Sequence, residues 1–400
     1  MTTVHPHSQA RVVIAGARFA GLEAVLALRA FAAGAVDLRV LSPHAQFVYT
    51  PAATGELFRL IPRTRWPLGG LIERAGARLV PAALEAIEAA KRRIITSDGQ
   101  MIEYDYAIVA VGGRAEAWLD APGVTFTGPD DVPSMGRALD EVVVRVESGQ
   151  RVRLAFVVPP GVGWVIPAYE LALMARRYLN ERAVGDRAQL MVVTSEDLPL
   201  GVFGQHAAQT VSEALVAANI ALHAGAIVQG WAEGRLRIVP DRSVEVDVVI
   251  ALPMIRGPRV PGIAQTPTGF VDADPDGRVR GERPVFVAGD AGPFPVKQGG
   301  LACQQADRVA AAICADLGIP TPEIPAWPVM RGLLWTADGD YFLRRDLAGG
   351  RDESLGTVSL ETALWWPPGK VAGRFLAPFL QEFELRELVD IPAPGTPQRR

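Results

Sequence analysis

The sequence predicts an α/β fold with two Rossmann-like, three-layer dinucleotide-binding domains and a small C-terminal cap. Two stretches, 11–41 and 153–194, each have the hydrophobic spacing of a strand, a turn, a helix and a second strand. A further apolar strand at 285–288 leads into an Ala-rich helix and predicts a return to the first domain. The chain has 400 residues, 49% of them apolar, which is enough for two such cores.

The first cycle predicts a strand at 11–15, a glycine turn, a proline-free helix at 20–33 and a partner strand at 36–41. Proline and glycine then interrupt residues 43–81. This pattern predicts an excursion over the carboxyl edge of the sheet, where ligands bind in such folds. We therefore expect functional residues in that segment.

A hairpin at 93–104 and a buried strand at 107–111 follow. The second cycle places a helix at about 167–182 between strands at 153–158 and 189–194. The predicted parts are the first section of the first domain (1–115), the second Rossmann-like domain (116–255), the remaining section of the first domain (256–325) and the C-terminal cap (326–400).

Charge and cysteine content restrict the function. The formal net charge is −4, with 40 basic against 44 acidic residues, so we expect no nucleic-acid partner. The two cysteines, Cys303 and Cys314, are too few for a disulfide framework and lack metal-ligand spacing, so we expect a cytoplasmic protein without a bound metal. No apolar run reaches the roughly 18 residues of a membrane span.

The glycine turn at 16–21 is an incomplete dinucleotide-binding fingerprint. Gly16 and Gly21 occupy the outer positions of G-x-G-x-x-G, but Arg18 replaces the middle glycine. The helix that begins near Phe19 and Ala20 would direct its amides and positive potential at a pyrophosphate. Arg18 either donates its guanidinium to the phosphates or fills the space that they need.

The acidic residue that binds a ribose hydroxyl after the second strand of such domains is missing. His44 stands close to that position in the segment Leu41-Ser42-Pro43-His44. It is a candidate ribose ligand, and the alternative is an ordinary residue of a surface loop.

The segment 285–307 contains Gly289-Asp290 followed by Lys297-Gln298-Gly299-Gly300-Leu301. It resembles the second FAD motif of the sulfide:quinone oxidoreductases and the type II NADH dehydrogenases, in the FAD-dependent pyridine nucleotide-disulfide oxidoreductase superfamily. The segments 12–24, 47–51 and 104–112 resemble the same family. The resemblance covers roughly residues 11 to 380 and implies a glutathione reductase-like fold that binds FAD.

The resemblance also implies roles for individual residues. Asp290 would hold the ribityl chain of the flavin. The helix entered through 297–301 would point its N-terminus at the pyrimidine edge, where reduced flavin carries negative charge. Pro51 would lie beside the isoalloxazine ring, and Gly112 would contact the adenine half. The implied FAD-binding residues of this segment are Gly289, Asp290, Lys297, Gln298, Gly299 and Leu301.

The second domain lacks the glycine turn that seats the pyrophosphate of NAD(P)H. Residues 159–163 hold two prolines, which have no amide to donate, and Trp164 occupies space beside them. The spacing therefore disfavours NAD(P)H. Glu170, which resembles the glutamate that starts this helix in the NADH dehydrogenases, and Glu196, a possible ribose ligand, keep NAD(P)H as an alternative.

Sulfide oxidation in the related family requires a redox pair of cysteines beside the flavin. Cys303 and Cys314 lie eleven residues apart on one predicted helix, so they cannot form a disulfide with each other. The sequence thus predicts an FAD-dependent oxidoreductase that exchanges electrons with a small organic molecule or a quinone without redox cysteines. The candidate catalytic residues are Lys297, Gln298 and Trp164.

Two alternatives stay open, namely an NAD(P)H-dependent flavin or quinone reductase and a non-redox homologue with weakened FAD binding that acts as a subunit or scaffold. The C-terminal block 365–380 places Trp365 and Trp366 near Lys370 and Arg374. This composition suits peripheral contact with the inner face of the membrane, and equally a homodimer contact or packing of the cap on the flavin domain.

Overall fold

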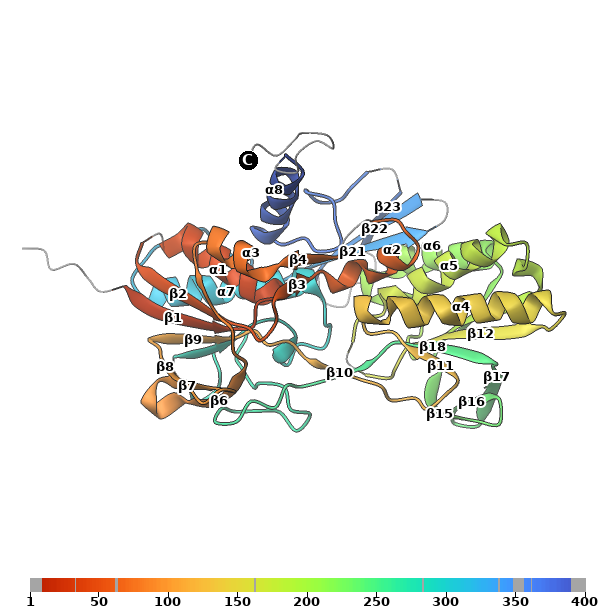
Figure 1. The fold of residues 1–400 in the computed structure, drawn as a ribbon, viewed down its shortest axis with the longest axis horizontal. Helices are drawn as coiled ribbons and strands as arrows, with labels where there is room; N and C mark the ends of the chain where they lie inside the picture. Colours follow the sequence, from red (N-terminus) through yellow and green to blue (C-terminus); the bar gives the residue numbers. More distant parts are fainter. Residues whose placement is uncertain are drawn as a thin grey trace, which may run out of the picture.

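The computed structural model describes residues 9–32, 34–61, 64–161, 163–282, 284–336, 339–347, 356–360 and 362–389. Figure 1 shows two lobes side by side, with the last elements of the chain lying across their upper side. The first lobe contains the N-terminal strands together with β20, and the second contains strands that lie between these in the sequence.

The first lobe is built on a parallel sheet in the order β20-β9-β1-β2-β5. α1 (Phe19–Ala32) and α7 (Gly299–Asp316) pack together on one face of this sheet. An antiparallel sheet, β6-β7-β8, covers the other face, which explains why both sides of the central strands are apolar. The strands β1, β2, β5, β6, β7, β8, β9 and β20 are Ala10–Ala15, Val36–Leu41, Arg78–Val80, Leu84–Glu88, Arg93–Thr96, Met101–Glu103, Tyr106–Val109 and Val285–Val287.

The second lobe repeats the design with the parallel order β11-β18-β12-β13-β14. The helices α4 (Val132–Glu147), α5 (Ile166–Glu181) and α6 (Gln205–Ala217) cover one face, and the antiparallel sheet β15-β16-β17 covers the other. The strands β11 to β18 are Gly123–Thr125, Val152–Val157, Ala188–Val193, Ile220–His223, Ile227–Ala232, Arg235–Val239, Arg242–Glu245 and Val248–Ala251.

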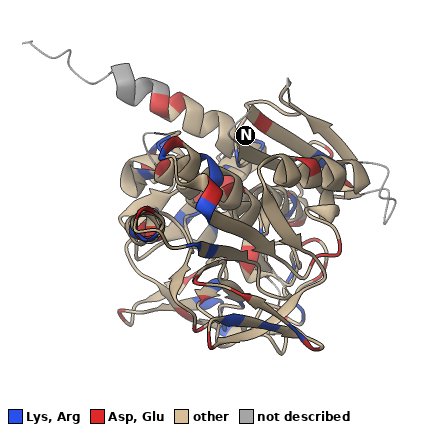
Figure 2. Cartoon of the chain, turned by 90° about the vertical axis from the view of Figure 1, so that its right-hand side faces the viewer, with Lys and Arg blue, Asp and Glu red and all other residues tan. Residues whose placement is uncertain are grey.

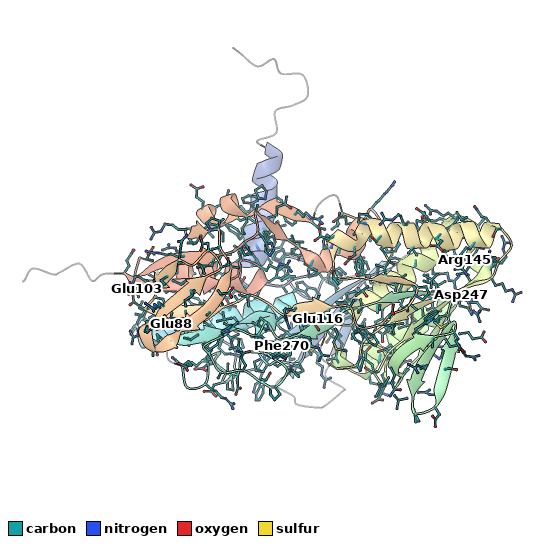
Figure 3. The ribbon with its side chains drawn as sticks, turned by 60° about the horizontal axis from the view of Figure 1, so that its bottom comes forward. Glu88, Glu103, Glu116, Arg145, Asp247 and Phe270 are labelled. Carbon is teal, nitrogen blue, oxygen red and sulfur yellow. The ribbon has the colours of Figure 1, made fainter. Side chains whose placement is uncertain are left out.

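A two-stranded ribbon of β10 (Arg114–Glu116) and β19 (Met254–Arg256) connects the lobes. Figure 3 labels Glu116 of this ribbon near the junction. Between β2 and β5 the chain forms short elements that lie along the upper side of the molecule in Figure 1. These elements are β3 (Gln46–Val48), α2 (Ala53–Leu57), β4 (Arg65–Pro67) and α3 (Leu68–Arg74).

The C-terminal region contacts both lobes. Its antiparallel sheet contains β21 (Val329–Thr336), β22 (Gly339–Asp346) and β23 (Gly356–Ser359), and it contributes Leu334 and Leu343 to the core of the second lobe. The last helix, α8 (Leu376–Val389), contributes instead to the core of the first lobe. The chain end therefore packs on both lobes. Within the described ranges, no helix combines the length and apolarity needed to cross a bilayer.

The predicted fold class is confirmed, because two three-layer lobes with central parallel sheets are present. The sequence predicted β1, β2, β7, β8, β9, β12, β13 and β20, and it missed the other strands that the structure describes, among them β5 and β6. β5 has only three residues and lies inside the proline-rich excursion. A strand this short cannot be recognised from the alternation of apolar and polar residues. The predicted domain limits stay a prediction.

A buried carboxylate fixes the start of α8. Glu23 of α1 is fully buried, and it accepts hydrogen bonds from the amides of Phe375 at 2.8 Å and Leu376 at 2.7 Å. Such amides have no partner inside their own helix, so a carboxylate there is favourable. Asp307 of α7 is also buried and faces Glu23. Burial, together with the Glu23 carboxylate, raises the pKa of Asp307 to about 8. Burial also raises the pKa of Glu23, so the two carboxyl groups together hold a proton to higher pH than isolated carboxyl groups do.

We predict that Asp307→Asn removes part of the pH dependence of stability. Below about pH 4 Asp307 is protonated in both the folded and the unfolded chain. From there to about pH 8 only the unfolded chain releases this proton, so the free energy of unfolding falls as the pH rises, by up to about 1.4 kcal/mol per pH unit. Asparagine is neutral throughout and lacks this loss.

Denaturant unfolding between pH 5 and 9 measures this difference. The free energy of unfolding of the Asp307→Asn variant should fall less over that range than that of the natural protein. Above pH 8, residue 307 should add no further pH dependence to the free energy of unfolding of either protein. Glu147→Gln, an exposed change of the same charge on α4, is the control and should follow the natural protein. Parallel curves for Asp307→Asn and the natural protein would contradict the assignment.

Candidate functional site

A cleft opens between the lobes at the carboxyl ends of their parallel strands. It encloses about 1510 Å³ of empty space, part of it open to solvent. The first lobe contributes the N-terminal turns of α1 and α7, the second lobe contributes the loop before α5, and the C-terminal region contributes Lys370. The cleft therefore collects segments that are far apart in the sequence.

The two outer glycines of the first turn are required by the packing of the backbone. Gly16 has φ +108°, and a Cβ on it would lie 2.2 Å from the carbonyl oxygen of Ala110. A Cβ on Gly21 would lie 1.9 Å from the carbonyl oxygen of Gly16. These contacts hold β1, β9 and α1 close together, so that Phe19 and Ala20 of the first helical turn line the cleft.

Arg18, which replaces the middle glycine, also lines the cleft. No described residue accepts a hydrogen bond from its guanidinium, and its nearest opposite charges are Asp130 and Asp290. Burial lowers the pKa of Arg18, and the two aspartates oppose this effect. The guanidinium is therefore a cation in the cleft with donors that are free to meet a ligand.

Asp290 offers the complementary acceptor. It follows β20 in a turn where Gly289 has φ +76° and donates its amide to Gln305 Oε1 at 2.8 Å. Among the described residues none donates a hydrogen bond to the Asp290 carboxylate, which lines the cleft. Burial raises the pKa of Asp290 to about 6, whereas Lys297 and Arg18 act in the opposite direction. Asp290 is thus a half-buried acceptor to which none of the described residues donates.

Lys297 and Gln298 immediately precede the first turn of α7. The ammonium of Lys297 donates to the carbonyl oxygen of Gly292 at 2.6 Å and lies 4.0 Å from the ring centre of Phe270, which Figure 3 labels. Burial lowers the pKa of Lys297 to about 8, and Asp290 opposes the shift. Lys297 can therefore exchange its proton near neutral pH.

Gln298 has a structural task that the sequence analysis did not identify. Its Oε1 accepts the amide of Leu301 at 3.0 Å and caps α7, while its Nε2 donates to the carbonyl oxygen of Arg331 on β21. Both ends of the amide are engaged, so the side chain orders the helix start and joins it to the C-terminal sheet. Its candidacy as a catalytic residue stays a prediction.

The cleft brings together most of the predicted site residues. Pro51, Gly112, Gly289, Gly299 and Trp164 line it beside the residues already described. Gly16, Gly21, His44 and Leu301 do not line it. His44 is exposed in the loop after β2, where its amide bonds Ser42 Oγ at 3.2 Å, and Leu301 is buried in the core. Their predicted cofactor contacts receive no support from the cleft geometry.

The loop before α5 crosses towards the first lobe. Gly163 pairs with Val296, and its carbonyl oxygen accepts the amide of Lys297 at 3.2 Å. Trp164 packs edge-on against Phe203 with ring centres 5.8 Å apart. The loop that would cradle a pyrophosphate in an NAD(P)H-binding domain thus connects the two lobes.

Glu196, the second candidate ligand for a pyridine nucleotide, already has protein partners. It accepts hydrogen bonds from the hydroxyls of Tyr169 at 2.6 Å and Thr194 at 3.1 Å. Burial raises the pKa of Glu196, and these hydrogen bonds act against the shift. Tyr169 is fully buried on the first turn of α5, so Glu196 contributes to the packing of the second lobe.

Both cysteines are buried in the first lobe. Cys303 Sγ lies 3.8 Å from the carbonyl oxygen of Phe19, and burial raises the pKa of the Cys303 thiol. Cys314 lies on the same helix, about 16 Å farther along its axis at the usual rise. The two thiols are too far apart to act as a pair.

A buried ion pair joins the C-terminal region to α5 of the second lobe. Glu170 of α5 is 1% exposed and forms an ion pair with Lys370. Its carboxylate also accepts the amide of Trp335 at 2.8 Å and the hydroxyl of Thr54. Lys370 in turn donates to the carbonyl oxygen of Leu333 at 2.8 Å. Nothing in the local sequence around Lys370 predicts this contact, because its partner is 200 residues away.

We predict that Lys370→Met destabilises the protein by about 3–5 kcal/mol, because it leaves the Glu170 charge buried without its cation. The double variant Glu170→Gln/Lys370→Met should recover much of this loss, since no charge then remains buried. Denaturant unfolding measures both values.

Arg177→Met is the matched control for this experiment. It breaks an exposed pair with Glu181 on the same helix and should cost well under about 1 kcal/mol. Equal stability of Lys370→Met and the natural protein would show that the pair does not hold the C-terminal region on the second lobe.

Residues 10–310 match the pyridine nucleotide-disulphide oxidoreductase family. The sulfide-quinone reductase of Aquifex aeolicus is 25% identical over 205 residues, which are 48% of this chain and only 44% of that protein. An NADH dehydrogenase-like protein of Mycobacterium tuberculosis is 27% identical over 300 residues, which are 70% of this chain and 72% of that protein.

Solved structures agree in fold. The sulfide:quinone oxidoreductase from Aquifex aeolicus has a TM-score of 0.76 at 19% identity, with 96% of this chain and 91% of that chain covered. NDH2 from Plasmodium falciparum in complex with NADH has a TM-score of 0.66 at 12% identity, with 95% of each chain covered. The resemblance inferred from the sequence is thereby confirmed. The chain belongs to the pyridine nucleotide-disulphide oxidoreductase family.

Proposed function

We propose that the protein passes electrons between bound FAD and a small organic molecule or a quinone, without redox cysteines and without NAD(P)H. The observation that carries this proposal is the pairing, in one cleft, of a free acceptor at Asp290 with the free donors of Arg18 and the α1 N-terminus. FAD needs donors for its phosphates and an acceptor for its ribityl hydroxyls, so this set of groups fits it.

The residues that would hold FAD follow from this fit. The amides of Phe19 and Ala20 and the guanidinium of Arg18 would bind the pyrophosphate, and the Asp290 carboxylate would accept from the ribityl hydroxyls. The N-terminus of α7 and the ammonium of Lys297 would face the pyrimidine edge. Bound FAD supplies two-electron redox chemistry, which belongs to the cofactor.

In the proposed reaction the protein positions the cofactor and the substrate and supplies a proton. The Lys297 ammonium is held by the carbonyl oxygen of Gly292, and its pKa of about 8 lets Nζ donate or accept a proton near neutral pH. Trp164 and Pro51 line the cleft and give it apolar surface. These positions favour a substrate that reacts directly in the cleft.

Two alternatives for electron transfer have weak support. A thiol route needs a cysteine pair, but Cys303 and Cys314 are buried and lie about 16 Å apart along α7. An NAD(P)H route needs free amides in the loop before α5, but that loop contains two prolines and pairs with Val296. Contact of the C-terminal region with the membrane surface, or with a second copy of the chain, stays part of the proposal.

The first test of the proposed function is spectroscopic. The purified protein should show the visible bands of flavin, or acquire them with added FAD, and dithionite should bleach them. NADH and NADPH at millimolar concentration should leave the bands unchanged over minutes. A protein that takes up no FAD would refute the proposal, and rapid bleaching by NADH would replace it with an NAD(P)H-dependent reductase.

The second test concerns Arg18. We expect Arg18→Gly and Arg18→Met each to weaken FAD binding by about tenfold or more, because each removes a charge-assisted donor from the phosphates. Methionine keeps much of the volume of arginine and glycine restores space, so the pair separates charge from size. Equilibrium dialysis of the protein with FAD measures the change. Tighter FAD binding by Arg18→Gly would show instead that the arginine obstructs the cofactor.

A further inference from the structure

The wall that the second lobe contributes to the cleft is apolar. Phe126, Trp164, Leu252 and Pro253 line it at the carboxyl ends of β11, β12 and β18, and Ile255 of the connecting strand β19 continues it. Among the lining residues between positions 116 and 255, none carries a charge. Such a wall attracts apolar surface and offers a charged group no partner.

The charged groups of the cleft all come from elsewhere. Arg18, Asp290 and Lys297 belong to the first lobe, and Lys370 belongs to the C-terminal region. The first three fall among the groups that the proposed function assigns to FAD. Lys370 is already paired with Glu170. The cleft therefore has a charged side for the cofactor and an apolar side with no assigned occupant.

The apolar wall also has room. Gly161 and Gly163 lie in the loop before α5, and a Cβ on either would have no atom within 4 Å. Pro159 and Pro160 remove two amides from the same loop, so it cannot bind phosphate as a glycine-rich loop does. The loop thus leaves open space beside Trp164, and it lacks the backbone amides that would bind an anion.

The second lobe is not apolar in general. Figure 2 views this lobe from its outer end and shows basic and acidic residues interspersed over its exterior. Figure 3 places Arg145 and Asp247 at that outer end, away from the junction. The lack of charge is therefore a local property of the wall that faces the cleft.

We propose that this wall binds an uncharged, predominantly apolar carbon compound, which is the substrate on the second-lobe side of the cleft. The inference rests on the proposed function, because the substrate must lie next to FAD. The proposed ligand of the second lobe is therefore a neutral molecule that packs against Trp164 and Ile255. A dinucleotide, whose pyrophosphate is charged, is not expected there. Desolvation decides the choice, since an anion would lose its water and gain no partner at this wall.

The test compares two probes of the same ring system on the FAD-loaded protein. One is 2-methyl-1,4-naphthoquinone, which is uncharged, and the other is 1,4-naphthoquinone-2-sulfonate, which carries one negative charge. Equilibrium dialysis in the dark, without an electron donor, gives the binding constants apart from turnover. We expect the uncharged probe to bind about tenfold more tightly or better.

Substitutions then locate the bound probe. Ile255→Lys should weaken the uncharged probe and strengthen the sulfonate, because it adds a cation to the half-buried edge of the wall. Ile227→Lys is the matched control, since Ile227 is 46% exposed on β15 and is not among the residues that line the cleft, and it should change neither constant. Trp164→Ala should weaken the uncharged probe by about tenfold through lost ring packing.

The inference is overturned if the sulfonate binds as tightly as the uncharged probe, or if neither probe binds. It is also overturned if Ile255→Lys and Trp164→Ala both leave the uncharged probe unaffected. If Ile255→Lys does not fold, Trp164→Ala alone decides. These failures differ from failure of the proposed function, because that proposal is lost when the protein carries no FAD, before either probe is added.

Discussion

A lysine ammonium and a glutamate carboxylate, Lys370 and Glu170, meet in the interior of the molecule, where neither charge is tolerated alone. Glu170 belongs to the second lobe, and Thr54, which donates to it, belongs to the excursion from the first. Lys370 and Trp335 bring in the C-terminal region. Because each group requires the others, α2, α5 and the C-terminal region are held in one arrangement.

Local sequence pattern was sufficient for the central strands, but it could not predict contacts between residues that are far apart in the sequence. Strands such as β1 and β12 are apolar on both sides because helices and antiparallel sheets cover both faces, so local pattern was sufficient to identify them. The partners of Glu170 come from positions 54, 335 and 370, and no local pattern connects them. Long-range charge pairing follows from the tertiary structure, and for that reason Lys370 was identified only as part of a basic and aromatic block.

Gln298 illustrates a second limit of sequence reasoning. Its place beside Lys297 at the start of α7 made it a candidate for chemistry, and the same place makes it the residue that caps the helix and bonds to β21. A polar residue at a helix N-terminus can satisfy the helix amides or a ligand, and the sequence is the same in both cases. Asp290 differs because, among the described residues, nothing donates to it, and this difference is visible only in the structure.

The two lobes share one architecture but have opposite chemistry at the cleft. In the first lobe the β1–α1 turn keeps its outer glycines because their backbones touch Ala110 and each other, and the amides of α1 stay open. In the second lobe the corresponding loop has prolines, pairs with Val296 and presents Trp164. The sheet and its helices are held by their own cores, so the loop could lose its phosphate-binding groups without loss of the fold. The second lobe thus has a dinucleotide-binding architecture whose contribution to the cleft is an apolar surface.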